Sequence, residues 1–118
     1  MLGVDVVSKA RIGAVWQRQG ERFPRRVLHP RELESWPPPG RPERFLAVRW
    51  VVKEALSKAL GTGLRGPVRM NAIALEHDEL GAPRLHCDAE LAPLLAGRQP
   101  RVSISDERDL VVAVVLLL

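Results

Sequence analysis

Two acidic residues and a lysine have the residue types and the spacing of a site for a metal ion and phosphate groups. Residues 44–63, RFLAVRWVVKEALSKALGTG, predict a helix that carries Glu54 and, one turn later, Lys58. This helix should end in a flexible turn, Gly61-Thr62-Gly63. The amino-terminal segment MLGVDVV predicts a strand with a single acid, Asp5. Together these residues suit a magnesium-dependent site for phosphorylated ligands.

The spacing of Glu54 and Lys58 alone leaves two interpretations open. A glutamate four residues before a lysine is also the commonest surface ion pair of a helix, worth about 0.3–0.5 kcal/mol. Asp5 favours the metal site, because a carboxylate in an apolar strand needs a partner and a metal ion is one. Two carboxylates from separate elements, with phosphate oxygens and water, hold Mg²⁺ at about 2.0–2.1 Å. The glycine turn adds little by itself, since glycine also simply ends helices.

Composition predicts one globular domain, residues 1–118, with 46% apolar and 27% charged residues. The net charge of +4 favours an anionic partner but does not choose its class. A single cysteine, Cys87, and the lack of an export signal favour a reducing cytoplasm. The longest apolar run, Leu110–Leu118, is half of a membrane span and predicts a buried strand, so no membrane partner is expected.

The order of apolar and helix-breaking residues predicts an α+β fold, with a mostly antiparallel sheet packed with one long helix. The first helix should follow an N-cap at Ser8 and run to about Arg22, where Pro24 stops it. The second should run from Pro42-Glu43 to Gly61. Later elements are expected as strands at Asn71–Asp78 and Arg84–Cys87, a short helix at Glu90–Ala96 ended by Gly97, and a closing hairpin of RVSISDE and DLVVAVVLLL.

The second helix carries apolar residues on both sides. At 100° per residue, one side forms a core stripe, whose members are Phe45, Val48, Val52, Ala55, Leu56 and Ala59. The side that carries Glu54 and Lys58 also carries Trp50 and Val51. We therefore expect a second cover over this helix, from a strand of the same chain or from another subunit.

Arginines recur along the first helix and just beyond it. Arg11, Arg18 and Arg25 are spaced by seven residues, and Arg22 comes four after Arg18. Arg11, Arg18 and Arg22 would line one side of the helix, away from its core stripe. This side is either a solubilising face or a docking strip for an acidic partner. Nucleic acid is not expected, because aromatic residues are not interleaved with the basic ones.

Two other polar groupings do not predict a site. His86 and Cys87 are adjacent on an expected strand, so their side chains point to opposite faces and do not form a nucleophile–base pair. The run 76–79, EHDE, lies at an expected turn and indicates a solvated acidic loop.

The chain resembles a known family in several segments at once. GVDVV, RFLAVRWVVKEALSKALGTG, the turn Gly81-Ala82-Pro83 and the closing VSIS strand, in this order, are similar to the bacterial holo-acyl-carrier-protein synthases. These enzymes belong to the 4′-phosphopantetheinyl transferase superfamily. The resemblance implies transfer of 4′-phosphopantetheine from coenzyme A to a serine of apo acyl carrier protein, in fatty acid biosynthesis. Adenosine 3′,5′-bisphosphate would be the second product.

The resemblance also implies roles for individual residues. Asp5 and Glu54 would bind Mg²⁺ on the pyrophosphate, where it neutralises charge during attack by the serine oxygen. Lys58 would stabilise the phosphate or assist proton transfer, so Glu54 and Lys58 are the expected catalytic residues. The nucleotide and its phosphates would be held by Arg49, Lys58, Gly61, Thr62, Gly63, Gly81, Pro83, Arg101 and Ser103.

Two further implications concern assembly and partners. The family forms homotrimers with sites between neighbouring subunits, which would explain Trp50 and Val51 beside Glu54. Its acidic carrier protein docks on the first helix, which implies a docking role for Arg11, Arg18, Arg22 and Arg25. The chain departs from the family at Arg101 and Asp106, where histidine is common, and we assign Asp106 no catalytic role.

Two other function classes compete with this one. A small basic module could bind RNA or an acidic protein, with Glu54 and Lys58 as a plain ion pair. A transferase for the carrier domains of peptide or polyketide synthases is the second, but such enzymes are usually two fused copies of the fold. A chain of 118 residues without an internal repeat argues against it.

Overall fold

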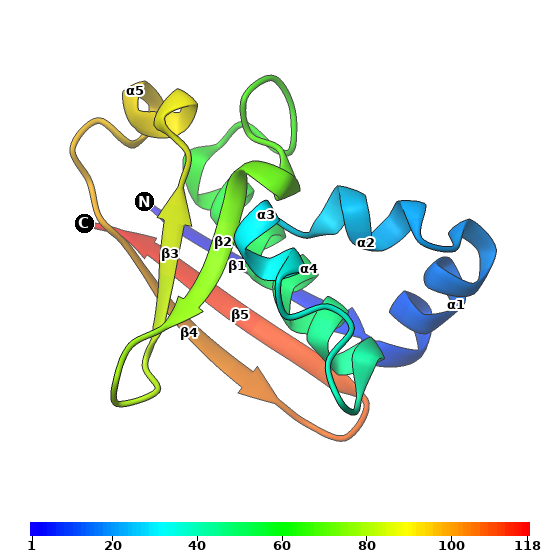
Figure 1. Cartoon of the computed structure of the whole chain (residues 1–118). Coiled ribbons are helices and arrows are strands. Elements are labelled where there is room, and N and C mark those ends of the chain that lie inside the picture. Colours follow the sequence, from blue (N-terminus) through cyan, green and yellow to red (C-terminus); the bar gives the residue numbers. More distant parts are fainter.

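The computed structural model describes all 118 residues and contains five strands and five α-helices (Figure 1). The elements are β1 (Leu2–Ser8), α1 (Lys9–Gln19), α2 (Arg22–Val27), α3 (Pro30–Leu33), α4 (Pro42–Leu60), β2 (Ile73–His77), β3 (Pro83–Cys87), α5 (Ala92–Leu95), β4 (Pro100–Asp106) and β5 (Leu110–Leu117), with 3₁₀ turns at Met70–Ala72 and Ala89–Leu91. None of the helices has the length and apolarity needed to span a bilayer.

The strands form two antiparallel sheets. One has the order β1–β5–β4 and the other is the β2–β3 hairpin. The long helix α4 lies across one face of the three-stranded sheet, and α1–α3 and the hairpin flank it (Figure 1). The α+β class and the closing β4–β5 hairpin are therefore confirmed.

The outer face of the three-stranded sheet carries no helix (Figure 1). Leu2, Val4 and Val6 of β1 are 63%, 53% and 54% exposed there. They pair in register with Leu116, Val114 and Val112 of β5, so the six aliphatic side chains share this face. We call these six residues the outer sheet patch.

The start and end of α4 agree with the sequence. Pro42 stands at the first helical position, where its missing N–H costs nothing, and Gly61 ends the helix with a φ of 76°. The expected double cover is also present, but the chain provides it alone. Val51 is fully buried, and the Trp50 ring is half-buried with its centroid 5.8 Å from that of Phe23 in α2. Another subunit is therefore not needed to cover Val51, and α2 of the same chain covers part of Trp50.

The first helix is shorter than the sequence predicts. The Ser8 side chain accepts a hydrogen bond from the Arg11 N–H, which confirms the N-cap, but α1 ends at Gln19. Gly20, with a φ of 63°, turns the chain, and α2 then starts at Arg22. Pro24 does not stop a helix, because it stands in the first turn of α2, where no backbone donor is required.

Smaller differences occur in the second half. The expected strand at Asn71–Asp78 begins only at Ile73, because Met70–Ala72 form a 3₁₀ turn. The expected helix at Glu90–Ala96 splits into a 3₁₀ turn and α5, and Ala96, with a φ of 51°, ends it before Gly97.

A buried ion pair joins four elements around α4. Lys53, fully buried, donates to Glu32 Oε1 of α3 and to the Val27 carbonyl at the end of α2. Glu32 Oε1 also accepts the His29 N–H, and Oε2 accepts the Leu75 N–H of β2 at 2.9 Å. Burial lowers the pKa of Lys53 to about 8, against the opposing pull of Glu32. Every oxygen of the carboxylate is thus used, which makes the pair a structural link and not a reactive one.

Removing one partner of this pair should be costly. We expect Lys53→Met to lower the free energy of unfolding by about 3–5 kcal/mol, because Glu32 would keep an uncompensated buried charge. Lys58→Met is the matched control on the same helix, since the Lys58 side chain is 52% exposed, and should change stability by about 0.5 kcal/mol or less. Urea unfolding measures both. Equal losses in the two variants would contradict the structural role of Lys53.

Candidate functional site

The structure brings Asp5, Glu54 and Lys58 together, and we call these three residues the carboxylate site. Asp5 lies on the side of β1 that faces α4, in register between the buried Gly3 and Val7. Lys58 Nζ lies 2.9 Å from Asp5 Oδ1. No ion pair within 4.0 Å joins Lys58 to Glu54. The simple i,i+4 surface pair is therefore not formed, and Lys58 pairs with the strand instead.

The electrostatics of this site favour a cation. Partial burial and the neighbouring negative charge of Asp5 raise the pKa of Glu54. The hydrogen bond to Asp5 raises the pKa of Lys58. Two carboxylates from neighbouring elements that repel one another offer the all-oxygen donor set that Mg²⁺ prefers. By the chemistry of their donor atoms, the residues present thus fit a magnesium ion.

The turn after α4 is built differently from a phosphate cradle. The Gly61 N–H donates to the Lys58 carbonyl, and the N–H groups of Thr62 and Gly63 both donate to the Ser57 carbonyl. The Thr62 hydroxyl donates to the Gly63 carbonyl. These donors end the helix, so the turn has no free N–H of these three residues to offer an anion. A role for Gly61, Thr62 and Gly63 in nucleotide binding stays a prediction that rests on their closeness to Lys58.

A second group of expected residues lines a cavity of about 450 Å³ between α4, the β2–β3 turn and β4. Arg49, Gly81, Pro83 and Ser103 all belong to it. The Arg49 guanidinium lies 3.5 Å from the centre of the Phe45 ring, and its Nη1 donates to the Phe45 carbonyl. Arg49 Nε lies 3.4 Å from Glu32 Oε2, so the buried pair of the core also orients this arginine. We call this hollow the Arg49 cavity.

The Arg49 cavity and the carboxylate site are separate within one chain. Arg49 and Lys58 are nine residues apart on α4, which puts them about 13 Å apart along the axis and on opposite sides. Neither Asp5, Glu54 nor Lys58 lines the cavity. Arg101 does not line it either, because it is exposed on β4 opposite Leu116, beside the outer sheet patch. The chain thus holds two separate candidate sites, the Arg49 cavity and the carboxylate site.

Asp106 lies at the rim of the Arg49 cavity with two cations. Its Oδ1 lies 2.6 Å from Lys9 Nζ, and its Oδ2 accepts a hydrogen bond from Arg44 Nε. The bond from Lys9 lowers the pKa of Asp106, and Arg44 adds to the effect. Asp106 is therefore ionised at neutral pH, and each of its two oxygens lies beside a cation.

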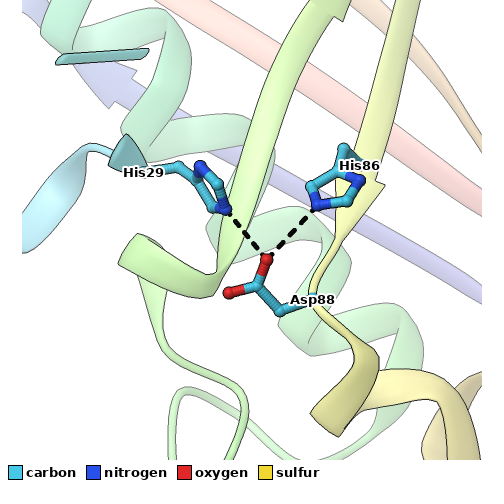
Figure 2. Close-up of side chains that lie close together, drawn as sticks. All are labelled: His29, His86 and Asp88. Carbon is cyan, nitrogen blue, oxygen red and sulfur yellow. Dashed lines mark hydrogen bonds and ion pairs between the residues drawn. The ribbon is translucent and has the colours of Figure 1, made fainter. Parts of the chain in front are cut away.

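A third polar cluster consists of His29, His86 and Asp88 (Figure 2). His29 Nε2 and His86 Nε2 lie 2.9 and 3.3 Å from the same oxygen, Asp88 Oδ1. His29 Nδ1 accepts the Arg31 N–H at the start of α3, so its proton sits on Nε2 and is donated to Asp88. A metal would need that nitrogen's lone pair. The cluster is therefore a hydrogen-bonded link between α3 and the end of β3.

The other groupings behave as the sequence predicts. Burial raises the pKa of Cys87 to about 11, so its thiol is protonated at neutral pH and is no nucleophile beside His86. Asp78 Oδ1 accepts the N–H groups of Leu80 and Ala82, which makes this acid the organiser of the β2–β3 turn. Neither grouping is a catalytic or metal centre.

The four arginines of the expected docking strip are all exposed. Arg11 and Arg18 lie on α1, but Arg22 and Arg25 lie on α2, since the first helix ends early. None of the four forms an ion pair with a carboxylate of the chain within 4.0 Å. Their positive charges therefore remain available to an external partner.

Sequence reasoning missed the contacts of several residues at and around the Arg49 cavity. Arg44 and Asp106 form the rim of the Arg49 cavity, and Glu32 orients Arg49 from a distance of 17 residues in sequence. The i,i+4 spacing of Phe45 and Arg49 could have indicated their contact. No local pattern indicates Glu32 or Asp106, because their partners are far away in the chain.

Comparison with known proteins places this chain and its fold in one class. Residues 1–115 match the family model described as the 4′-phosphopantetheinyl transferase superfamily. The holo-[acyl-carrier-protein] synthase of Dechloromonas aromatica is 44% identical over 118 residues, which cover 98% of this chain and 94% of that protein.

Solved structures of holo-[acyl-carrier-protein] synthases have the same fold as this chain. The crystal structure of the Neisseria meningitidis holo-[acyl-carrier-protein] synthase superposes with a TM-score of 0.94 at 39% identity, covering 99% of this chain and 96% of that one. The Helicobacter pylori enzyme, solved in complex with coenzyme A, gives 0.87 at 28% identity with full coverage of both chains. Within the superfamily, the chain belongs to the holo-[acyl-carrier-protein] synthases, and it is thus a phosphopantetheinyl transferase.

The raised pKa of Glu54 predicts that the ionised side chain lowers the stability of the fold when no divalent cation is bound. Its folded pKa lies above the ordinary value, so stability falls as the pH rises from that value through the raised one. Without divalent cations at pH 7, Glu54→Gln should therefore raise Tm by about 1–2 °C, as expected for relief of a like-charge contact. The gain should vanish near pH 4, where the wild-type side chain is protonated.

Thermal unfolding followed by circular dichroism measures this effect. Glu34→Gln is the control, because Glu34 is exposed and has no ion-pair partner, and it should leave Tm unchanged. A lower Tm of Glu54→Gln at pH 7 would show that Glu54 stabilises the metal-free fold.

Proposed function

We propose that Asp5 and Glu54 hold a magnesium ion with which this transferase moves the 4′-phosphopantetheine group from coenzyme A to a serine of apo acyl carrier protein. The observation that carries the proposal is the meeting of two repelling carboxylates and Lys58 at one place in a chain of this family. The coenzyme A complex of the Helicobacter pylori relative supports the donor. The product would be holo acyl carrier protein, made for fatty acid biosynthesis.

Each residue of the carboxylate site would have its own role in the transfer. Magnesium, when bound, neutralises the pyrophosphate while the serine oxygen attacks the β-phosphorus. Asp5 and Glu54 fix the position of that charge from the strand and the helix. Lys58 is largely exposed and has three donors, so its ammonium can leave Asp5 for a phosphate oxygen at little cost. The bond from the β-phosphorus to the bridging oxygen breaks, adenosine 3′,5′-bisphosphate leaves, and the serine proton passes to water.

The Arg49 cavity suits the nucleotide part of coenzyme A. Its lining combines the guanidinium of Arg49 with Gly81, Pro83 and Ser103. Arg49 is held by Phe45 and Glu32, so it loses little side-chain freedom on binding a phosphate. The cavity would therefore hold adenosine and its phosphates, as the resemblance implies for these residues.

Two observations support a homotrimer with sites between subunits. One chain keeps the Arg49 cavity and the carboxylate site on opposite sides of α4, so one coenzyme A would need halves from two subunits. The outer sheet patch places six aliphatic side chains side by side, four of them exposed and two partly buried, as interfaces between subunits do. The number of subunits itself comes from the resemblance to the family.

Mass spectrometry tests the activity directly. Purified enzyme with Mg²⁺ and coenzyme A should add one 4′-phosphopantetheine group to apo acyl carrier protein. Asp5→Ala and Glu54→Gln should each lower the rate at least about 100-fold, since each removes one charged ligand of the ion. Turnover near the wild-type rate in both variants, or without any divalent cation, would exclude the metal assignment.

Mixing of inactive subunits tests the shared site. Lys58→Ala disables the carboxylate site and Arg49→Ala disables the Arg49 cavity, and each variant alone should be nearly inactive. After exchange of subunits in an equal mixture, about one quarter of the interfaces should combine two intact half-sites and regain activity. Mixtures of each variant with itself are the control. Activity that stays at the level of the single variants would indicate sites within one chain.

The arginines of α1 and α2 supply a surface for the acidic carrier protein. Arg11, Arg18, Arg22 and Arg25 are unpaired on one stretch of the chain, and α2 also borders an apolar groove at Phe23 and Trp50. Such a surface combines charge for long-range attraction with apolar area for contact. We therefore assign the docking of the carrier protein to this region.

Charge reversal tests the docking strip. Arg18→Glu should raise KM for acyl carrier protein about 10-fold at low salt, and the effect should shrink as the salt concentration rises. KM for coenzyme A should stay near the wild-type value. Arg98→Glu, in the loop before β4, is the control for net charge and should change neither constant. A rise of both constants in Arg18→Glu would assign the strip to the nucleotide site or to the fold.

A further inference from the structure

Gly3 makes an unusually close contact with α4. A Cβ atom at Gly3 would lie 2.0 Å from the Ala55 carbonyl oxygen and 2.5 Å from the Ala59 nitrogen. Both atoms belong to the backbone of the helix and cannot move aside as a flexible side chain can. Among the nine glycines, only Gly13 has another close neighbour, and that neighbour is the side chain of Glu43. At Gly3, β1 therefore comes so close to α4 that no side chain would fit between them.

This contact lies at the carboxylate site. Ala55 and Ala59 directly follow Glu54 and Lys58 on α4. On β1, Asp5 comes two residues after Gly3 and shares its side of the strand. The same strand–helix distance that Gly3 permits thus sets how far Asp5 is from Glu54 and from Lys58. The Asp5–Lys58 contact of 2.9 Å is one direct consequence.

We propose that Gly3 is a positioning residue for the metal site: it lets β1 approach α4 closely enough for Asp5 and Glu54 to share one divalent cation. This inference rests on the proposed metal-binding role of these two acids. Real Cβ atoms essentially never lie within 3.0 Å of such neighbours, so an alanine would push the strand and the helix apart by about 1 Å. A magnesium site tolerates little such displacement of its ligands, because Mg²⁺ requires near-octahedral coordination at about 2.0–2.1 Å.

Direct metal binding tests the inference. The probe is Mn²⁺ with coenzyme A present, and the free ion is counted by electron paramagnetic resonance. Gly3→Ala should weaken Mn²⁺ binding at least 10-fold and raise the Mg²⁺ concentration for half-maximal transfer by a similar factor. Gly13→Ala is the matched control and should leave both values unchanged, because its methyl group meets only the flexible Glu43 side chain. A folded Gly3→Ala variant with wild-type Mn²⁺ affinity would overturn the proposal.

A longer acid should compensate for a wider gap. Asp5→Glu adds one methylene, about 1.5 Å, so in the Gly3→Ala background it should restore Mn²⁺ binding at least partly. In the wild-type background the same change should weaken binding about 10-fold, because the carboxylate overshoots. Asp5→Glu would thus strengthen Mn²⁺ binding in the Gly3→Ala background and weaken it in the wild type. A general loss of packing at Gly3 would not produce these opposite effects. If Gly3→Ala does not fold, Asp5→Glu in the wild-type background still tests the proposal. Wild-type Mn²⁺ affinity in that variant would mean that the distance between the carboxylates of residues 5 and 54 is not critical, and it would overturn the proposal.

One further variant separates this inference from the proposed function. Asp5→Ala should lose Mn²⁺ binding if the metal site is assigned correctly. Wild-type affinity in Asp5→Ala would remove the metal assignment and the role of Gly3 with it. Loss in Asp5→Ala together with wild-type affinity in Gly3→Ala would remove only the role of Gly3.

Discussion

The buried pair of Glu32 and Lys53 is the interaction on which the rest of this structure depends. Helices of six and four residues, such as α2 and α3, are too short to be stable alone. Lys53 holds the last carbonyl of α2, while Glu32 holds the N–H of His29, the N-cap of α3, and an N–H of β2. Four elements thus depend on one charge pair inside the core. Its strength comes from complete hydrogen bonding, because an ion pair buried without such bonds would not offset its desolvation.

The same pair explains how one helix carries residues of both the carboxylate site and the Arg49 cavity. Lys53 and Glu54 are neighbours, but a rotation of 100° turns the lysine into the core and leaves the glutamate half-exposed toward Asp5. Glu32 also contacts Arg49, one turn before Lys53, and so orients the cavity on the other side. The core pair therefore fixes α4 against the hairpin, and Gly3 fixes it against β1. The residues of α4 at both places are held firmly because the helix is fixed from both sides.

Local patterns in the sequence predicted the elements whose ends have local causes. Pro42 and Gly61 mark the ends of α4, and Ser8 caps α1, each through its own backbone preference. The break at Gly20 was missed because Pro24 looked like the stop, whereas proline is also tolerated in a first helical turn. The burial of Val51 and Lys53 depends on α2, α3 and β2, which are distant in sequence, so no helical wheel could assign their cover. Asp5, Glu54 and Lys58 were found through residue types, but their separation from Arg49 required the fold.

Asp106 shows how an acid can stand beside an anion site without opposing it. Its carboxylate is bonded to Lys9 and Arg44, and its lowered pKa keeps it ionised at neutral pH. The group of three carries a net positive charge, and Arg49 adds a further one nearby. The acid reduces the total charge of the rim, but it also holds the long side chain of Arg44 in one place. A cation whose side chain is already ordered loses less conformational entropy when a phosphate binds. Asp106 would thus weaken the positive field at the rim but also lower the entropic cost of binding a phosphate there.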